Sequence, residues 1–203
     1  MGDLTLQHVV LRTVAVLLIA SVHGWAIAAT ACRLGDPGPR HDERLSFNPM
    51  RHLDILGFLL AVLFTFGWVR SMSIDRERLW LGRAGLAIVV MAASGTTIGL
   101  ALLAQFMRPI MLNWLSDTAS STYFILVETV AQLCLSFTLF NLLPVPPLTG
   151  QYLLAAVLSP RRDLLRRLSP GVAVLLALAI ASGAMARLFA PIEAAVRPLI
   201  IIS

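Results

Sequence analysis

The sequence predicts an all-α integral membrane protein with about four transmembrane helices and one re-entrant or interfacial segment. Three observations predict this fold class. Of the 203 residues, 58% are hydrophobic and only 13% are charged, and the mean hydropathy is +0.82. The charged residues gather in short stretches between long apolar runs. The arginines are also divided unequally between the loops. A soluble chain could not cover so much apolar surface with so few charges.

A bilayer core of about 30 Å requires roughly 20 apolar residues as an α-helix. Four segments meet this length, and we expect each of them to span the membrane within one membrane domain, 1–203. The expected spans are residues 9–32, 84–106, 123–143 and 171–190.

A fifth apolar segment, residues 55–69, is shorter and lies between Asp54 and Arg70. If it crossed the membrane, the sixteen arginines would divide almost evenly between the two sides. If it enters and returns, eight arginines fall in loop 33–83 and four in loop 144–170, on one side, and four remain elsewhere. Because cytoplasmic loops are enriched in basic residues, we predict a re-entrant or interfacial segment and place both basic loops in the cytoplasm.

The formal net charge of +5 would be compatible with nucleic-acid binding in a soluble protein. Here the charges flank membrane segments, where they report orientation. We therefore expect lipid and other membrane subunits as partners and no nucleic acid. The last apolar residues, after Pro198, are also expected to contact lipid or another subunit.

Three polar blocks interrupt the apolar pattern. The first is 23-HGWAIAATACRLGD-36. The second, 45-LSFNPMRHLDILG-57, contains Asn48, Pro49, His52 and Asp54. The third, 139-LFNLLPVPPLTGQYLL-154, contains Asn141, Pro144, Pro146, Pro147, Thr149 and Gly150. Asn48–Pro49 is typical of a turn, and Asp54 is a candidate N-cap for the segment that follows.

In their order and in their amino-acid sequence, these blocks resemble the site-2 metalloproteases, which are intramembrane zinc peptidases. The resemblance extends over most of residues 14–158. The resemblance implies a helical membrane core and a zinc centre. The second block matches the family pattern N-P-x-x-H-x-D-x-x-G. The third block is close to the family's sequence motif around Asn141 and Gly150. The residues shared with these two blocks are therefore expected to be structural.

The departures from the family fall on its chemistry. The resemblance implies an H-E-x-x-H helix with two zinc ligands and a general base, and a third ligand as an Asp. This chain keeps His23, but Gly24 replaces the Glu, Ile27 replaces the second His, and Thr149 replaces the Asp. A single neutral imidazole does not hold catalytic zinc. We therefore expect neither zinc nor another cofactor, and no catalytic residue.

A rebuilt site from other ionisable residues is the alternative. His23, His52 and the intramembrane Glu128 are its candidates. The other explanation for Glu128 is a protonated carboxyl or a hydrogen bond to a neighbouring helix.

The leading hypothesis is a catalytically inactive site-2-protease-like protein, serving as a structural or accessory subunit of a larger membrane complex. One alternative is an active intramembrane zinc metalloprotease with altered ligands. Another is a pseudoprotease that binds transmembrane clients without cleaving them. In each case we expect a multi-pass protein of a bacterial inner membrane.

Overall fold

The computed structural model describes residues 5–157 and 162–200, and every regular element among these residues is a helix. This confirms the all-α membrane class. The helices are α1 Leu6–Arg33, α2 Gly38–His41, η1 Pro49–Arg51, α3 Ile55–Phe64, α4 Gly82–Leu112, α5 Asp117–Asn141, α6 Gln151–Val157, α7 Arg162–Ala181 and α8 Ala184–Ile200. Residues 158–161 of the second basic loop, and 201–203 of the final apolar run, lie outside the described residues.

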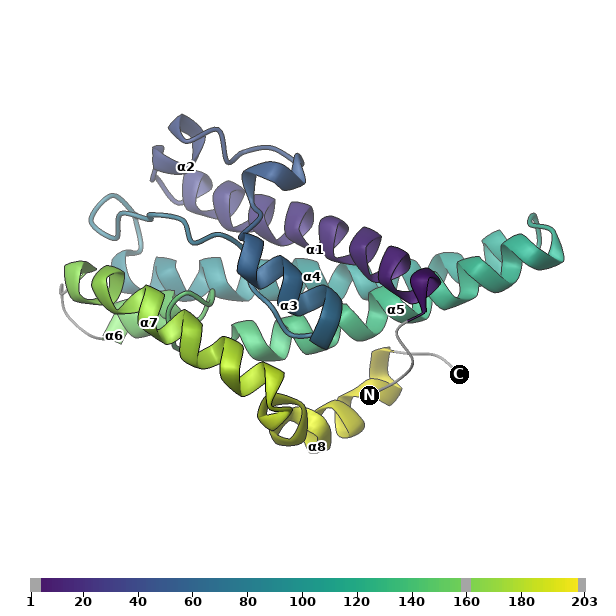
Figure 1. Cartoon of the computed structure of the whole chain (residues 1–203). Coiled ribbons are helices and arrows are strands. Elements are labelled where there is room, and N and C mark those ends of the chain that lie inside the picture. The colour runs from purple at the N-terminus through teal and green to yellow at the C-terminus, as the bar shows by residue number, and fades with distance from the viewer. Residues whose placement is uncertain (1–4, 158–161, 201–203) are drawn as a thin grey trace.

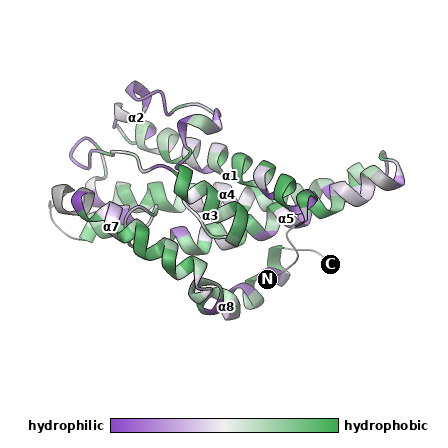
Figure 2. Cartoon of the chain, in the orientation of Figure 1, coloured by the Kyte–Doolittle hydropathy of each residue, from purple (hydrophilic) through white to green (hydrophobic). Residues whose placement is uncertain are grey.

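Helices α1, α4 and α5 form the central bundle, and each contacts the other two (Figure 1). Each is long and apolar enough to cross a membrane. Their residues are mostly hydrophobic, while many hydrophilic residues lie in the loops around α2 and others on α7 and α8 (Figure 2). This distribution is the one expected of a multi-pass membrane protein, whose polar residues leave the apolar layer.

The expected span 171–190 differs from the structure. Helix α7 ends at Ala181, α8 begins at Ala184, and the two helices are bent by 71° at this break. Gly183 lies in the break with φ 75°, a left-handed conformation that ends a helix and that glycine adopts without steric cost. Within the described residues, three helices could each span a membrane, or four if the bent pair counts as one span.

The segment 55–69 enters the fold and returns to its starting level. Helix α3 covers only ten residues. Thr65 then reverses the chain in a left-handed conformation with φ 71°. Leu53 and Val69 form an antiparallel β-bridge, and the Arg70 amide donates to the His52 carbonyl at 2.7 Å. The two ends of this segment are therefore paired, and we call it the re-entrant hairpin after the expectation from the sequence.

Two glycines allow the two arms of the re-entrant hairpin to touch. A Cβ atom on Gly57 would lie 2.3 Å from the Trp68 carbonyl oxygen. A Cβ atom on Gly67 would lie 2.1 Å from the Gly57 carbonyl oxygen. Since real Cβ atoms do not approach so closely, any other residue would force the arms apart. This contact explains the glycine at the end of the second sequence block.

The connection from α1 to α4 and the connection from α5 to α6 lie at the same end of the bundle (Figure 1). The hairpin between α4 and α5 projects beyond α1 at the opposite end (Figure 1). The described parts of loops 33–83 and 144–170 therefore meet at one end of the bundle.

Candidate functional site

Four elements converge on His23, which is fully buried at 0% exposure on α1. Its Nδ1 lies 2.8 Å from Oγ1 of Thr97 on α4, and its Nε2 lies 2.8 Å from Oγ1 of Thr149, just before α6. Phe137 of α5 meets the imidazole edge-to-face, with ring centroids 5.0 Å apart. Both ring nitrogens therefore have hydroxyl partners from other parts of the chain.

The hydrogen-bond pattern around His23 assigns its tautomer. The Thr97 hydroxyl donates to the Ala93 carbonyl at 2.9 Å, so its oxygen accepts the Nδ1–H of His23. Nε2 then carries the lone pair and accepts the hydroxyl hydrogen of Thr149. The nitrogen that could bind a metal is consequently capped by the residue at the third ligand position.

The donors at this site do not fit a catalytic zinc ion. Zinc takes thiolate, imidazole and carboxylate ligands, normally three from the protein. Here His23 is accompanied by two neutral hydroxyls, and Ile27, at the second ligand position, is a buried aliphatic side chain. Among the described residues, no group of three or more His, Cys, Asp or Glu side chains is placed to hold a metal ion.

His52 occupies the space beside Gly24. A Cβ atom on Gly24 would lie 2.3 Å from both Cγ and Nδ1 of His52, and 2.8 Å from its Cβ. Because the Cβ of His52 is among these atoms, rotation of the imidazole alone would not make room. The backbone near His52 therefore approaches α1 more closely than any side chain at position 24 allows.

The His52 imidazole is buried, and its two ring nitrogens differ in their hydrogen bonding. Its Nε2 donates to the Ser46 carbonyl at 2.7 Å, while Nδ1 is enclosed and has no hydrogen-bond partner among the residues that the structure describes. Burial lowers the pKa of His52, and the charge of Arg44 lowers it further, against the raising effect of the Ser46 carbonyl. His52 is therefore neutral near pH 7.

The remaining residues of the second block shape the entry to the re-entrant hairpin. Asn48 accepts the Met50 amide at 3.0 Å as the N-cap of η1, and Pro49 is its first helical residue. Asp54 accepts the Gly57 amide at 2.9 Å as the N-cap of α3. Both are local capping contacts of the kind that the sequence predicts.

Asn141 connects three segments at the third block. Its Nδ2 donates to the carbonyls of Gly67 and Phe137, each at 2.9 Å, and its Oδ1 accepts the Thr149 amide at 3.4 Å. Its own carbonyl accepts the Gly150 amide at 2.7 Å. A Cβ atom on Gly150 would lie 2.1 Å from the Leu143 carbonyl oxygen. Asn141 thereby fixes Thr149 beside His23.

The prolines of the third block direct the chain from α5 towards α6. Pro146 and Pro147 are buried, whereas Pro144 is exposed. The Pro147 carbonyl accepts the Ser71 hydroxyl at 3.0 Å, which joins this block to the exit of the re-entrant hairpin. Sequence reasoning did not assign this contact.

Tyr152 makes a second connection that the sequence did not indicate. Its hydroxyl donates to the Met72 carbonyl at 2.7 Å and accepts the Met72 amide at 3.2 Å. Both backbone groups of Met72 are thus satisfied by one side chain. Burial raises the pKa of Tyr152, since the phenolate would be desolvated.

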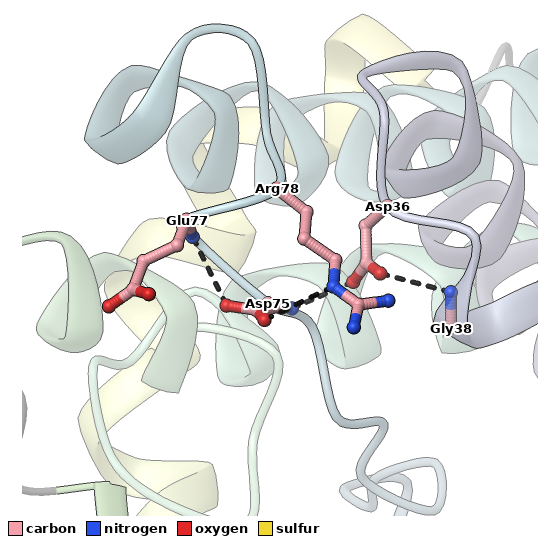
Figure 3. A network of polar contacts seen from close by, with 5 residues as sticks. All are labelled: Asp36, Gly38, Asp75, Glu77 and Arg78. Atoms are coloured by element: carbon pink, nitrogen blue, oxygen red, sulfur yellow. Dashed lines mark hydrogen bonds and ion pairs between the residues drawn. The ribbon is translucent and has the colours of Figure 1, made fainter.

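Asp36, in the first block, has a structural role (Figure 3). Its carboxylate is buried and accepts the amides of Gly38 and Asp75, at 2.9 and 2.7 Å. Asp75 in turn contacts Arg78 at 3.4 Å and accepts the Glu77 amide at 3.1 Å (Figure 3). These contacts tie the end of α1 to the connection that precedes α4.

Glu128 lies outside the His23 cluster. Its carboxylate pairs with Arg108 of α4 at 3.4 Å, and the Arg108 guanidinium lies 4.3 Å from the ring centroid of Phe124. Arg108 is about three turns further along α4 than Thr97. The structure therefore pairs Glu128 with a neighbouring helix and does not bring it to His23.

Arg12 is the residue that sequence reasoning overlooked. It lies inside α1, and its Nη1 donates to the carbonyls of Val62 and Leu63 at 3.2 and 3.3 Å. These carbonyls belong to the last turn of α3, where no further helical turn satisfies them. An arginine within an apolar segment was the available indication.

We compared the chain with known proteins. No family model matches it, and no solved structure matches it. A protein of Bacillus subtilis (strain 168), named "Putative zinc metalloprotease YwhC", is 30% identical over 146 residues. The similarity supports a metalloprotease family. The matched region is 69% of this chain, and the chain spans 65% of the length of that relative.

Proposed function

We propose that this chain is a catalytically inactive relative of the site-2 metalloproteases, retained as a structural or accessory subunit of a membrane complex. The observation that carries the proposal is the pair of hydrogen bonds that occupies both nitrogens of His23. A ligand histidine must present a free lone pair to the metal. In this chain the Thr149 hydroxyl takes that lone pair.

The position of the general base supports the same conclusion. A Glu at position 24 would need the volume that the His52 side chain fills. The family pattern contains both a Glu and this His, so the two side chains would have to lie further apart in an active relative. The close approach at Gly24 favours a chain that has repacked after the base was lost.

The contacts that hold the scaffold, in contrast, are intact. Asn141, Asp54 and Gly150 all make the local bonds or close contacts that their motif positions require. Preservation of the framework without its chemistry favours a role in binding or assembly. We therefore propose that what remains useful is the shape of the membrane core.

Zinc analysis tests the catalytic part of the proposal. The full chain, purified in a mild detergent and dialysed against trace zinc, is expected to retain no more zinc than its His23→Ala variant. Both samples should also leave a fluorescent single-span membrane peptide uncut. One equivalent of zinc that is lost in His23→Ala would overturn the proposal and favour an active protease with altered ligands.

Co-purification tests the accessory part. A subunit is expected to migrate with fixed partners in constant stoichiometry after gentle solubilisation. If crosslinking instead captures varied single-span clients at low stoichiometry, the chain is a client-binding pseudoprotease. Migration as the isolated chain, without fixed partners, would contradict the subunit role.

We further propose that loops 33–83 and 144–170 face the cytoplasm of a bacterial inner membrane. Single cysteines at the exposed positions Ser73 and Asn113 test this in a variant without Cys32 and Cys134. In intact spheroplasts, a membrane-impermeant maleimide should label position 113 and spare position 73. The reverse pattern would invert the topology.

A further inference from the structure

Arg44 is buried at the base of the re-entrant hairpin and forms no ion pair with a carboxylate in the described part of the chain. The residue is 8% exposed, and Nη1 is enclosed with no hydrogen-bond acceptor among the described residues. Its backbone amide donates to the Pro39 carbonyl at 2.9 Å, which fixes the turn that points it inward. A guanidinium has five N–H donors and no acceptor, so it requires oxygen atoms from elsewhere.

The nearby acidic residues do not supply those oxygens. The Glu43 carboxylate forms an ion pair with Arg51, and Asp42 acts on Arg44 only as a nearby charge. Arg51 and Arg70 add positive charge around the guanidinium. Removing one partner of a buried ion pair is strongly destabilising because an uncompensated charge remains. This arrangement therefore favours a bound anion.

The charges near Arg44 also favour a bound anion. Burial lowers the pKa of the Arg44 guanidinium, Arg70 lowers it further, and Tyr152 and Asp42 oppose the change. An anion at this position would relieve both unfavourable effects. Arg70 itself is exposed, so its side chain is available to the same ligand.

Large apolar side chains that follow Arg44 in the sequence are exposed. Leu45, Phe47, Met50 and Ile55 are exposed at 43%, 58%, 62% and 80%. Phe47 is held by stacking on Trp25, with centroids 4.7 Å apart. These side chains flank the entry of the re-entrant hairpin, where basic and large apolar residues together are typical of the membrane interface.

We propose that Arg44, together with Arg70, binds a phosphate group, supplied by the headgroup of an anionic phospholipid whose chains lie over Phe47 and Met50. Phosphate oxygens match the guanidinium fork, and an anionic lipid suits a basic interfacial surface. Free phosphate offers the same oxygens without the chains. The proposal goes beyond the accessory role and does not depend on it.

Lipid binding to the full chain tests this site. The chain is delipidated in a non-ionic detergent and titrated with dioleoyl phosphatidylglycerol, followed by native mass spectrometry. Arg44→Gln should weaken the affinity roughly tenfold or more, as expected for loss of charge-assisted hydrogen bonds. Arg33→Gln removes an exposed arginine of the same loop and should change the affinity less than about twofold.

Further measurements distinguish a phospholipid headgroup from free phosphate as the source of the phosphate group. Dioleoylglycerol, which has the same chains and no phosphate, should bind much more weakly than the phospholipid. Sodium phosphate that raises the melting temperature more than chloride at equal ionic strength, and does so through Arg44, would assign the site to the free ion. If Arg44→Gln does not fold, Arg70→Gln serves instead and should weaken lipid binding. Equal affinity in wild type, Arg44→Gln and Arg70→Gln, or equal binding of dioleoylglycerol, would overturn the proposal.

Discussion

The side chain of His52 lies against the bare backbone of Gly24, so close that a Cβ atom at position 24 would be 2.8 Å from the Cβ atom of His52. The contact joins the first and second sequence blocks. It also places a residue of the entry turn where the family resemblance expects a general base. Several consequences can be measured.

Gly24→Ala should lower the free energy of unfolding by about 1–3 kcal/mol, because an added Cβ overpacks this contact. Pairing it with His52→Ala should recover only part of that loss in a double-mutant cycle, because alanine removes the Cγ and Nδ1 atoms but keeps the Cβ atom 2.8 Å away. Thermal unfolding in detergent measures both. Gly95→Ala is the matched control, since nothing lies within 4 Å of its Cβ position. A Gly24→Ala variant as stable as the control would show that the contact is not tight.

Thr149→Val should destabilise the protein by about 1–3 kcal/mol because it leaves Nε2 of His23 buried without a donor. Thr149→Ser retains the hydroxyl and should cost clearly less. The two variants are compared by their melting temperatures. Equal losses would indicate that packing of the methyl group, and not the hydrogen bond, governs stability here.

Arg12→Met should loosen the last turn of α3, because the carbonyls of Val62 and Leu63 lose their donor. Hydrogen bonds to charged groups contribute about 1.5–3 kcal/mol. Hydrogen exchange of residues 62–67 should accelerate, with Arg12→Lys intermediate. The exposed Arg33→Gln variant should exchange like wild type, and unchanged protection in Arg12→Met would contradict the contact.

Arg108→Met should destabilise more than the double change Arg108→Met with Glu128→Met, because the single change leaves a carboxylate unpaired between α4 and α5. A loss of about 1–3 kcal/mol is expected for the single variant, since the pair is partly buried. A thermal double-mutant cycle in detergent gives the coupling. Additive effects would mean that the two charges do not interact.

His52 should make stability depend on pH. Its folded pKa lies below the ordinary value of about 6.5, so the unfolded chain binds a proton more readily. Its contribution is therefore fully present above about pH 6.5 and declines as the pH falls towards the folded pKa. His52→Gln should flatten the melting temperature between pH 7 and 5 relative to wild type. Parallel curves would assign the pH dependence to other groups.

The long spans could be predicted because membrane-length helices must be apolar over their whole length. The shortness of segment 55–69 and the arginines around it indicated that it does not cross the membrane, and the structure gives it a helix of only ten residues. The break at Gly183 could not be predicted, because a glycine in an apolar segment is compatible with a continuous helix as well as with a bend. Whether the helix bends at this glycine depends on how α8 packs on α5 and α4.

The candidate site could be predicted only in part from the sequence. The resemblance singled out His23 and Thr149, which are far apart in sequence and in contact in the fold. It could not show that Thr97 would be the second hydrogen-bond partner of His23. Nor could it show that His52 would lie against Gly24. Hydrogen-bond partners across helices depend on the rotation and depth of each helix, which hydropathy does not encode.

The re-entrant hairpin is held at three places: by Arg12 at the last turn of α3, by Asn141 at Gly67 on the returning arm, and by the bridge of Leu53 with Val69 at its base. These contacts tie the segment to both α1 and α5, so a swing of the hairpin away from the bundle would have to break all of them. Helices α7 and α8 meet at Gly183 instead, so an opening of the core towards the bilayer would break fewer contacts there than at the hairpin.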